Sequence, residues 1–125
     1  MTSAYSVKSK EIVICGQRFV VKQANTLEAS MRYVKIQDAE NKWNEDNAGK
    51  QELTLEEVIL KRELTILYPT AICVTSSLDE PLPAVNEFIT MPFEEKENWL
   101  STVRELNPQF FPEFEDSEEE AEKKS

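Results

Sequence analysis

The sequence predicts a mainly α (α+β) fold: a small domain of three to five helices with an N-terminal β-hairpin. Three observations predict it. Apolar residues recur at helical spacing over most of the chain, two short β-branched runs near the start flank a glycine, and acids dominate the end. We expect residues 1–10 to be a flexible N-terminus, residues 11–112 to form the single domain, and residues 113–125 to be a disordered acidic tail.

The runs EIVIC and RFVVK predict the hairpin, with its turn at Gly16-Gln17. A glycine beside a polar residue between two β-branched runs is a turn signal. Two strands alone are only marginally stable in water, so one face of the hairpin must pack onto helices. We expect that face to come from Ile12, Ile14, Phe19 or Val21.

Two helices in the first half are predicted from their first residues. Asn25 with Glu28, and Thr54 with Glu57, have the spacing of a capping box. The inward stripe of the first helix is expected to be Leu27, Met31 and Val34, with Tyr33 or Ile36 beside it. The second helix is the most apolar one, through Val58, Ile59, Leu64, Ile66 and Leu67, and is expected at the centre of the core.

Breaks and short elements complete the prediction. The stretch NKWNEDNAGK is expected to be a loop, with Trp43 as an anchor, and Tyr68-Pro69 is expected to end or kink the second helix. Residues 71–77 are compatible with either a strand or another helical turn. Two further helices are expected, one opening at Pro83 and one after Met91-Pro92, the latter with the stripe Trp99, Leu100, Val103 and Leu106 and an end at Asn107-Pro108.

Charge excludes one class of partner. The chain has 24 acidic and 14 basic residues, a net charge of −10. Binding to nucleic acid needs clustered lysine and arginine, so a nucleic-acid partner is not expected. No run of apolar residues approaches the ~20 needed to span a membrane, so we expect a soluble intracellular protein.

The residues for catalysis or metal binding are scarce. There is no histidine, and there are only two glycines and two cysteines. We therefore expect no enzymatic activity, no metal and no cofactor. Cys15 and Cys73 each lie in an apolar run, so each is expected to be a small buried residue.

The last third of the chain is rich in large apolar side chains. One interpretation is that they complete the core, because small domains depend on large aromatic residues. The other is that they form a partly exposed patch that binds an apolar segment of a partner protein. On the second interpretation the partner-binding residues are Phe88, Met91, Phe93, Trp99, Phe110 and Phe111.

The order of motifs resembles a known family. The chain opens with I-x-I-x-G-x-x-F-x-V at residues 12–21, continues with Glu28, Ala29 and Arg32, and closes with N-E-F-x-x-M-P at 86–92 and W-x-x-x-V-x-x-L-N-P at 99–108. Over residues 11–112 this is similar to the tail assembly chaperones of long-tailed bacteriophages. The resemblance implies a protein of the host cell cytoplasm that binds the tape measure protein and keeps it soluble while the tail tube is built. It also implies self-association of copies along that partner.

Two other functions are compatible with the sequence. A structural virion or connector component would share the small size and the hairpin, and it would be found in purified particles at a fixed copy number. An acidic mimic of DNA would share the negative charge. Half of the excess charge lies in residues 113–125, however, and not along a rigid face.

Overall fold

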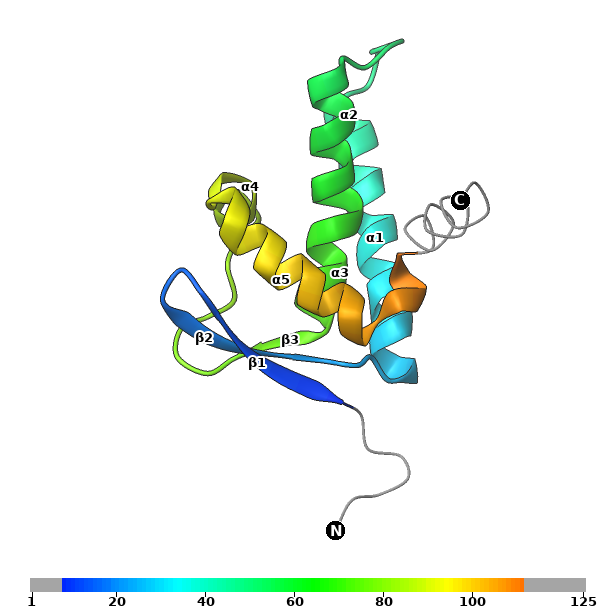
Figure 1. Ribbon diagram of the computed structural model, residues 1–125. Helices are drawn as coiled ribbons and strands as arrows, with labels where there is room; N and C mark the ends of the chain where they lie inside the picture. Colours follow the sequence, from blue (N-terminus) through cyan, green and yellow to red (C-terminus); the bar gives the residue numbers. More distant parts are fainter. Residues whose placement is uncertain (1–7, 112–125) are drawn as a thin grey trace, which may run out of the picture.

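The computed structural model describes residues 8–111 and has a small antiparallel sheet under a helical body (Figure 1). The sheet order is β1-β2-β3. The elements are β1 Ser9–Ile14, β2 Gln17–Lys22, α1 Thr26–Asp46, α2 Leu55–Arg62, the π-helical turn η1 Glu63–Leu67, α3 Tyr68–Cys73, β3 Thr75–Ser77, α4 Val85–Thr90, α5 Phe93–Leu106 and the 3₁₀ turn η2 Pro108–Phe110. Because α2, η1 and α3 follow one another without a break, the helices form four rods, and the predicted mainly α fold is confirmed.

The hairpin is present, with its turn one residue earlier than predicted. Ile14 pairs with Gln17, so the two central residues are Cys15 and Gly16, with φ of 50° and 78°. Positive φ at both central residues is the pattern of a type I′ turn, whose twist matches that of paired strands. The expectation that Cys15 is buried is wrong: it is exposed at the tip, where its N–H donates to Glu95 Oε2 at 3.1 Å.

The inward face of the hairpin is the predicted one. Ile12, Ile14, Phe19 and Val21 are all buried, and Phe19 stacks on Trp99 of α5 with ring centroids 6.2 Å apart. Strand alternation places these four side chains on one face, which α5 covers. The hairpin starts at Ser9, so Ser9 and Lys10 belong to a strand and not to the predicted flexible N-terminus. Residues 1–7 and the predicted acidic tail, 113–125, lie outside the described residues.

Residues 71–77 form both of the structures that their composition allowed. Helix α3 continues to Cys73, and β3 then pairs with β2 in the register Val21↔Thr75. Thr75 is buried, where its hydroxyl donates to the Ala71 carbonyl at 2.6 Å and accepts from Trp99 Nε1–H at 2.9 Å. The hairpin is thereby extended to three strands.

Helix α1 begins as predicted but turns a different face inward. Both halves of the Asn25–Glu28 capping box are formed. Leu27, Met31 and Val34 are 70%, 44% and 50% exposed, so the predicted inward stripe is wrong. The helix also continues to Asp46, through much of the predicted loop.

The long helical rod passes through Pro69 without ending. Proline has no N–H and its ring clashes with the carbonyl four residues earlier, so a regular α-helix cannot continue through it undisturbed. Here the π turn η1 ends at Leu67, two residues before Pro69, and it shifts the hydrogen-bond pattern by one residue. The α2 part of the rod is not at the centre of the core as predicted, because Val58 and Ile59 are half-exposed, whereas Ala71 of α3 is buried in the core.

The core lies between the sheet, α3, α4 and α5. Its largest fully buried side chains are Trp99 and Phe88, whose rings meet edge to face at 5.8 Å. Lys96 is also buried, with Nζ 2.8 Å from Glu63 Oε1 and 5.0 Å from the Phe88 ring centroid. This pair joins α5 to η1 across the core.

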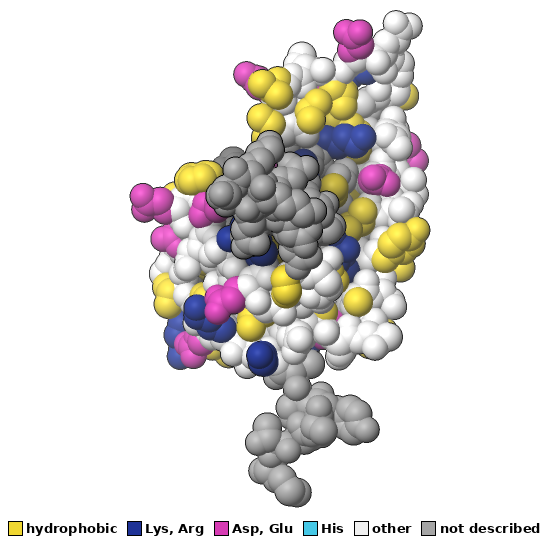
Figure 2. Space-filling model, turned by 45° about the vertical axis from the view of Figure 1, so that its right-hand side comes forward, with side chains coloured by type: hydrophobic (Ala, Val, Ile, Leu, Met, Phe, Trp, Pro, Cys, Tyr) yellow, Lys and Arg dark blue, Asp and Glu magenta, His cyan; other side chains and the backbone are white. Residues whose placement is uncertain are grey.

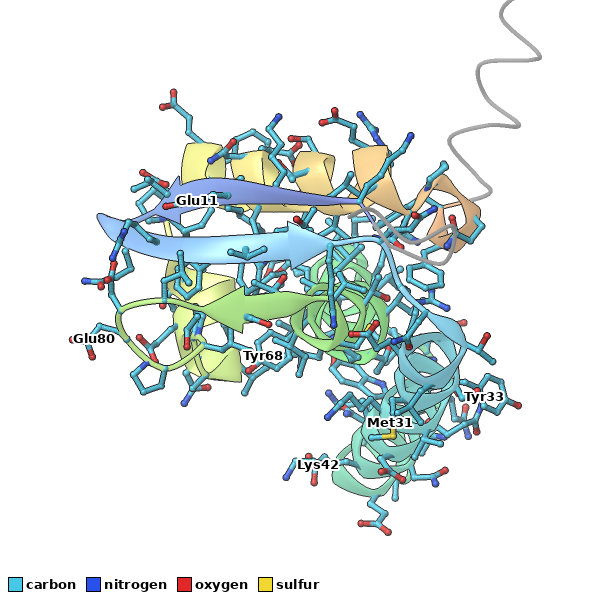
Figure 3. The ribbon with its side chains drawn as sticks, turned by 90° about the horizontal axis from the view of Figure 1, so that it is seen from below. Glu11, Met31, Tyr33, Lys42, Tyr68 and Glu80 are labelled. Carbon is cyan, nitrogen blue, oxygen red and sulfur yellow. The ribbon has the colours of Figure 1, made fainter. Side chains whose placement is uncertain are left out.

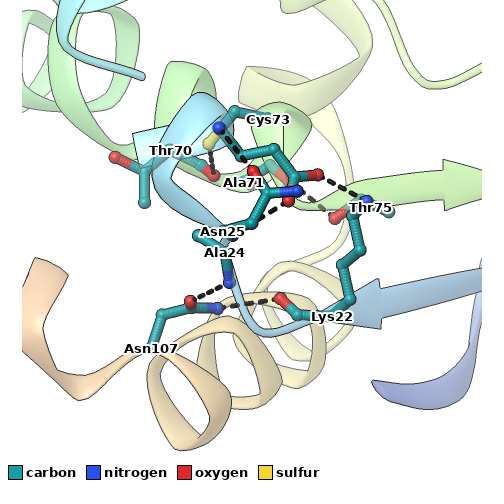
Figure 4. Close-up of polar contacts among 9 residues, drawn as sticks. Lys22, Ala24, Asn25, Thr70, Ala71, Cys73, Thr75 and Asn107 are labelled. Carbon is teal, nitrogen blue, oxygen red and sulfur yellow. Dashed lines mark hydrogen bonds and ion pairs between the residues drawn. The ribbon is translucent and has the colours of Figure 1, made fainter. Parts of the chain in front are cut away.

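Asn107, at the end of α5, connects this helix to the link between β2 and α1. Its side chain is fully buried, its Oδ1 accepts from the Ala24 N–H at 2.7 Å, and its Nδ2 donates to the Lys22 carbonyl at 3.0 Å (Figure 4). One amide therefore satisfies two backbone groups in the link between β2 and α1. Within residues 8–111, every buried side-chain nitrogen or oxygen has a hydrogen-bond partner.

Candidate functional site

A largely apolar groove of about 470 Å³ lies beside α1. Charged residues of α1 form one lip, and the rod α2–η1–α3 and helix α4 form the floor and the other side. The lining residues are Lys35, Asp38, Ala39, Lys42, Trp43, Asp46, Leu60, Leu64, Tyr68, Pro69, Ile72, Val85, Asn86 and Ile89.

Residue spacing explains the α1 side of the groove. Lys35, Ala39, Lys42 and Asp46 fall at intervals of three or four, so they lie along one side of the helix. Ala39 is small and leaves space between the longer side chains. Trp43 closes the upper end and is buried, and the side-chain amide of Asn47 donates to its carbonyl at 2.9 Å. Figure 3 shows Lys42 on this side of α1.

Tyr68 joins the floor of the groove to the segment before α4. Its hydroxyl donates to the Pro83 carbonyl at 2.6 Å, and its ring meets Phe88 edge to face at 5.2 Å. Burial, and to a lesser extent the charge of Glu87, raises the pKa of Tyr68. The hydroxyl therefore remains a proton donor at neutral pH, and the groove keeps its shape.

The groove is suited to binding by burial of apolar surface. The four charges on its α1 lip, Lys35, Lys42, Asp38 and Asp46, sum to zero. Its lining has no histidine, cysteine, serine or threonine, and its ionisable groups are these four charges and Tyr68. Among residues 8–111, no three His, Cys, Asp or Glu side chains gather closely enough to hold a metal ion.

A second apolar feature lies on α1, outside the lining of the groove. Leu27, Met31 and Val34, the stripe predicted to face inward, lie exposed at helical spacing. Figure 3 shows Met31 on the outer surface of α1, with Tyr33 further round the helix. On α2, Leu55, Val58 and Ile59 are exposed as well. In Figure 2 hydrophobic side chains come to the surface on the upper part of the molecule, where α2 lies.

Three of the six predicted partner-binding residues are in the core. Phe88, Trp99 and Phe111 are 0%, 1% and 4% exposed. The prediction is corrected for these three, because a side chain sealed in the core has no surface to offer a partner. Phe88 and Trp99 are buried because α4 and α5 turn their aromatic faces toward the sheet and α3, and Phe111, which follows η2, is part of the same core cluster.

The other three predicted residues do not form one surface. Phe93 is 74% exposed at the start of α5. Phe110 is half-buried under the Arg32 guanidinium, 4.4 Å from its ring centroid. Met91 is half-buried and lines a different hollow, of about 620 Å³, at the hairpin tip.

That hollow is the larger of the two, but Gln17, Glu80 and Glu87 make its lining more polar. Next to Glu80 in the chain, the Asp79 carboxylate accepts from Arg18 Nη2–H at 2.8 Å and from the Arg18 backbone N–H at 3.1 Å. These hydrogen bonds lower the pKa of Asp79. Of the two hollows, the groove beside α1 is the better apolar site.

Comparisons of this chain with family models, curated proteins and solved structures found no match. The site is therefore judged on its own geometry. No helix in the described part of the chain is long and apolar enough to cross a membrane.

Sequence reasoning missed the groove because its lining comes from segments far apart in the chain. Lys35, Asp38 and Lys42 appear in the sequence as an ordinary solvated helix face. The signal that was available is the spacing of Ala39 and Trp43, which places a small and a large residue one turn apart on the side of α1 that faces the rod.

Proposed function

We propose that this protein is a chaperone of phage tail assembly that binds a helical segment of the tape measure protein in the groove beside α1. The observation that carries the proposal is the groove itself, with its apolar floor and its lip of zero net charge. Amphipathic helices bind in such grooves through residues spaced three or four apart. The motif resemblance over residues 11–112 supports the choice of partner.

The dimensions support a helix as the occupant. Helix α1 lines the groove from Lys35 to Asp46, which at about 1.5 Å per residue is roughly 17 Å of lip, or about three helical turns. The exposed stripe Leu27, Met31 and Val34 extends the apolar surface beyond the groove. A helical segment lying along α1 would therefore contact both.

Self-association belongs to the same proposal. Coating a long partner requires many copies of the protein bound side by side. The contacts between neighbouring copies must be weak. The exposed Leu55, Val58 and Ile59 of α2 offer apolar surface on the face opposite Leu60 and Leu64, which line the groove. The net charge of −10 would keep such a coat dispersed.

The test is co-expression with the product of the longest open reading frame near the gene, which the proposal takes to be the tape measure protein. We expect that protein to be soluble and to co-purify with the wild-type chain. Val85→Glu, at a partly exposed position of the groove wall, should weaken the complex about 10- to 100-fold, because a carboxylate would be desolvated on binding.

Phe93→Glu is the matched control. It places the same charge on an exposed apolar residue outside the groove and should leave binding unchanged. Equal loss in both variants, or an insoluble partner in the presence of the wild-type chain, would contradict the proposal. Finding the chain in purified particles at a fixed copy number would favour a virion component instead.

A further inference from the structure

The charges on the α1 lip of the groove alternate in sign along the helix. Lys35, Asp38, Lys42 and Asp46 follow one another at intervals of three or four residues, so they form one row on the helix surface, which we call the charged row. Within the part of the chain that the structure describes, none of these four side chains makes a hydrogen bond or an ion pair. In Figure 3 Lys42 extends from α1 into open space, with no helix or strand beyond it in that view.

The charged row is complementary to itself when it is reversed. From the N-terminal end its charges are positive, negative, positive and negative, and from the C-terminal end each sign is exchanged. Two antiparallel copies of α1 with facing rows therefore bring Lys35 near Asp46 of the second copy, and Asp38 near Lys42 of the second copy. Two-fold symmetry repeats both pairs, so that only opposite charges meet. A parallel arrangement in the same register would instead place lysine against lysine and aspartate against aspartate.

A small residue lies where the two helices come closest. The two-fold axis of the antiparallel arrangement passes near Ala39, which lines the groove between Lys35 and Lys42. Packed helices approach to about 8–10 Å, depending on the side chains at the contact, and alanine permits a close approach. The aliphatic stems of the lysines then cover apolar surface while their ammonium groups reach the carboxylates.

The last turn of α1 favours a positive charge from outside the chain. It contains Glu45 and Asp46 and no basic residue. The C-terminal end of a helix carries the negative end of the helix dipole, which favours cations. In the antiparallel pair, Lys35 of the second copy lies beside Asp46 and supplies that cation. The pairing therefore offsets an unfavourable feature of the single chain.

We propose that the charged row of α1 binds the same row of a second copy in an antiparallel, two-fold dimer. Lys35 to Asp46 span only about 17 Å of helix, and ion pairs at a surface are individually weak, so the dimer is weak and loses affinity in salt. This contact differs from the one through Leu55, Val58 and Ile59, which lie on α2.

The dimer also regulates access to the groove. A second copy on the charged row lies across one lip of the groove, so it competes there with a helical partner. This competition rests on the proposed function, whereas the dimer itself does not.

Two variants with exchanged charges test the pairing. Lys35→Glu with Lys42→Glu makes the whole row negative, and Asp38→Lys with Asp46→Lys makes it positive. In sedimentation equilibrium at low salt, each variant alone should dimerise with a Kd at least about 10-fold above the wild-type value, because like charges then meet. An equimolar mixture of the two variants should form a mixed dimer at least as tight as the wild-type dimer. Raising the salt to about 0.5 M should weaken the wild-type dimer.

Matched charge reversals outside the row are the control. Lys8→Glu with Lys61→Glu, and Glu52→Lys with Glu80→Lys, change the net charge by the same amounts at positions outside the lining of the groove. These variants should keep the wild-type Kd and gain nothing on mixing. Unchanged circular dichroism verifies the fold of every variant.

Three results would overturn the proposal. One is a wild-type chain that stays monomeric at low salt up to about 1 mM. Another is a wild-type Kd for each row variant alone, which would assign the dimer to another face. The third is a mixture that binds no more tightly than its two components. Because these measurements use this chain alone, their outcome is independent of the co-expression test of the groove.

Discussion

Asn107 shows how much one side chain can fix in a small domain. Its amide is fully buried and pairs with the backbone of Lys22 and Ala24, 85 and 83 residues away in the sequence. A buried backbone group that loses its partner costs about 1–3 kcal/mol.

We therefore predict that Asn107→Ala lowers the free energy of unfolding by about 2–4 kcal/mol, since it leaves two backbone groups unpaired. Asn98→Ala is the control, because Asn98 is exposed and its one bond across to the sheet, to the Val13 carbonyl, is 3.3 Å long. Its cost should stay below about 1 kcal/mol. Urea unfolding followed by circular dichroism measures both, and equal costs would show that Asn107 has no special role.

Cys15 is the other residue whose backbone conformation matters. It has φ of 50°, and the left-handed region costs a residue other than glycine roughly 1 kcal/mol, less for asparagine. Asn-Gly is the preferred pair for this turn type.

We predict that Cys15→Asn raises the free energy of unfolding by about 0.5–1 kcal/mol. Cys15→Ala, which removes the thiol but retains the strain, should give no such gain. Thermal unfolding of the two variants measures the difference in stability. If the Cys15→Ala chain is as stable as the Cys15→Asn chain, backbone strain at residue 15 does not explain the gain.

At the scale of elements, local signals in the sequence were reliable and long-range ones were not. The capping boxes at Asn25 and Thr54 and the end of α5 at Asn107 depend only on neighbouring residues, and all three are present. For residues 71–77 the sequence left a strand and a helical turn open, because so short a strand as β3 exists only through its pairing with β2.

Helix α1 shows why the orientation of a helix was the hardest feature to predict. Periodicity identified a real stripe at Leu27, Met31 and Val34 but could not tell which side of the helix packs inward. The inward side includes Arg32, whose aliphatic stem is half-buried while its Nε donates to Thr70 Oγ1 at 2.8 Å. Hydropathy ranks arginine as polar, so the face with Leu27, Met31 and Val34 was predicted to point inward instead.

The contact between α5 and η1 can be tested through its buried ion pair. Lys96→Met removes the partner of Glu63 and leaves a largely buried carboxylate, so we predict a loss of about 2–3 kcal/mol, below the full cost of a completely buried pair because both groups retain some exposure. Adding Glu63→Leu to that variant should recover at least half of the loss. Urea unfolding measures both, and an additive loss in the double variant would contradict this account.

At the scale of the whole molecule, the aromatic residues of the last third divide between core and surface. The sequence identified the large apolar residues of the last third, but it could not tell which of them are buried in the core and which are exposed. Core packing and partner binding both need large apolar side chains. The core contains Phe88, Trp99 and Phe111 from the last third of the chain. The aromatic residues of the groove are Trp43 and Tyr68, which lie earlier in the chain.

The exposed aliphatic residues lead to a prediction about assembly. Val58→Lys with Ile59→Lys on α2 should shift sedimentation-equilibrium masses toward the monomer at high protein concentration, since charge on an apolar contact opposes burial. Lys50→Gln with Lys61→Gln changes charge nearby without altering the apolar surface, and it should have a smaller effect. A wild-type chain that is monomeric at every concentration would rule out self-association through this face.

The positions of the two tryptophans have a practical consequence. Trp99 is sealed in the core against Phe19 and Phe88, while Trp43 forms the upper end of the groove. Their fluorescence therefore reports on different events: the emission of Trp99 changes when the domain unfolds, and that of Trp43 changes when something enters the groove. A Trp43→Phe chain gives the Trp99 signal alone, and subtracting it from the wild-type signal isolates the Trp43 emission that follows occupancy of the groove.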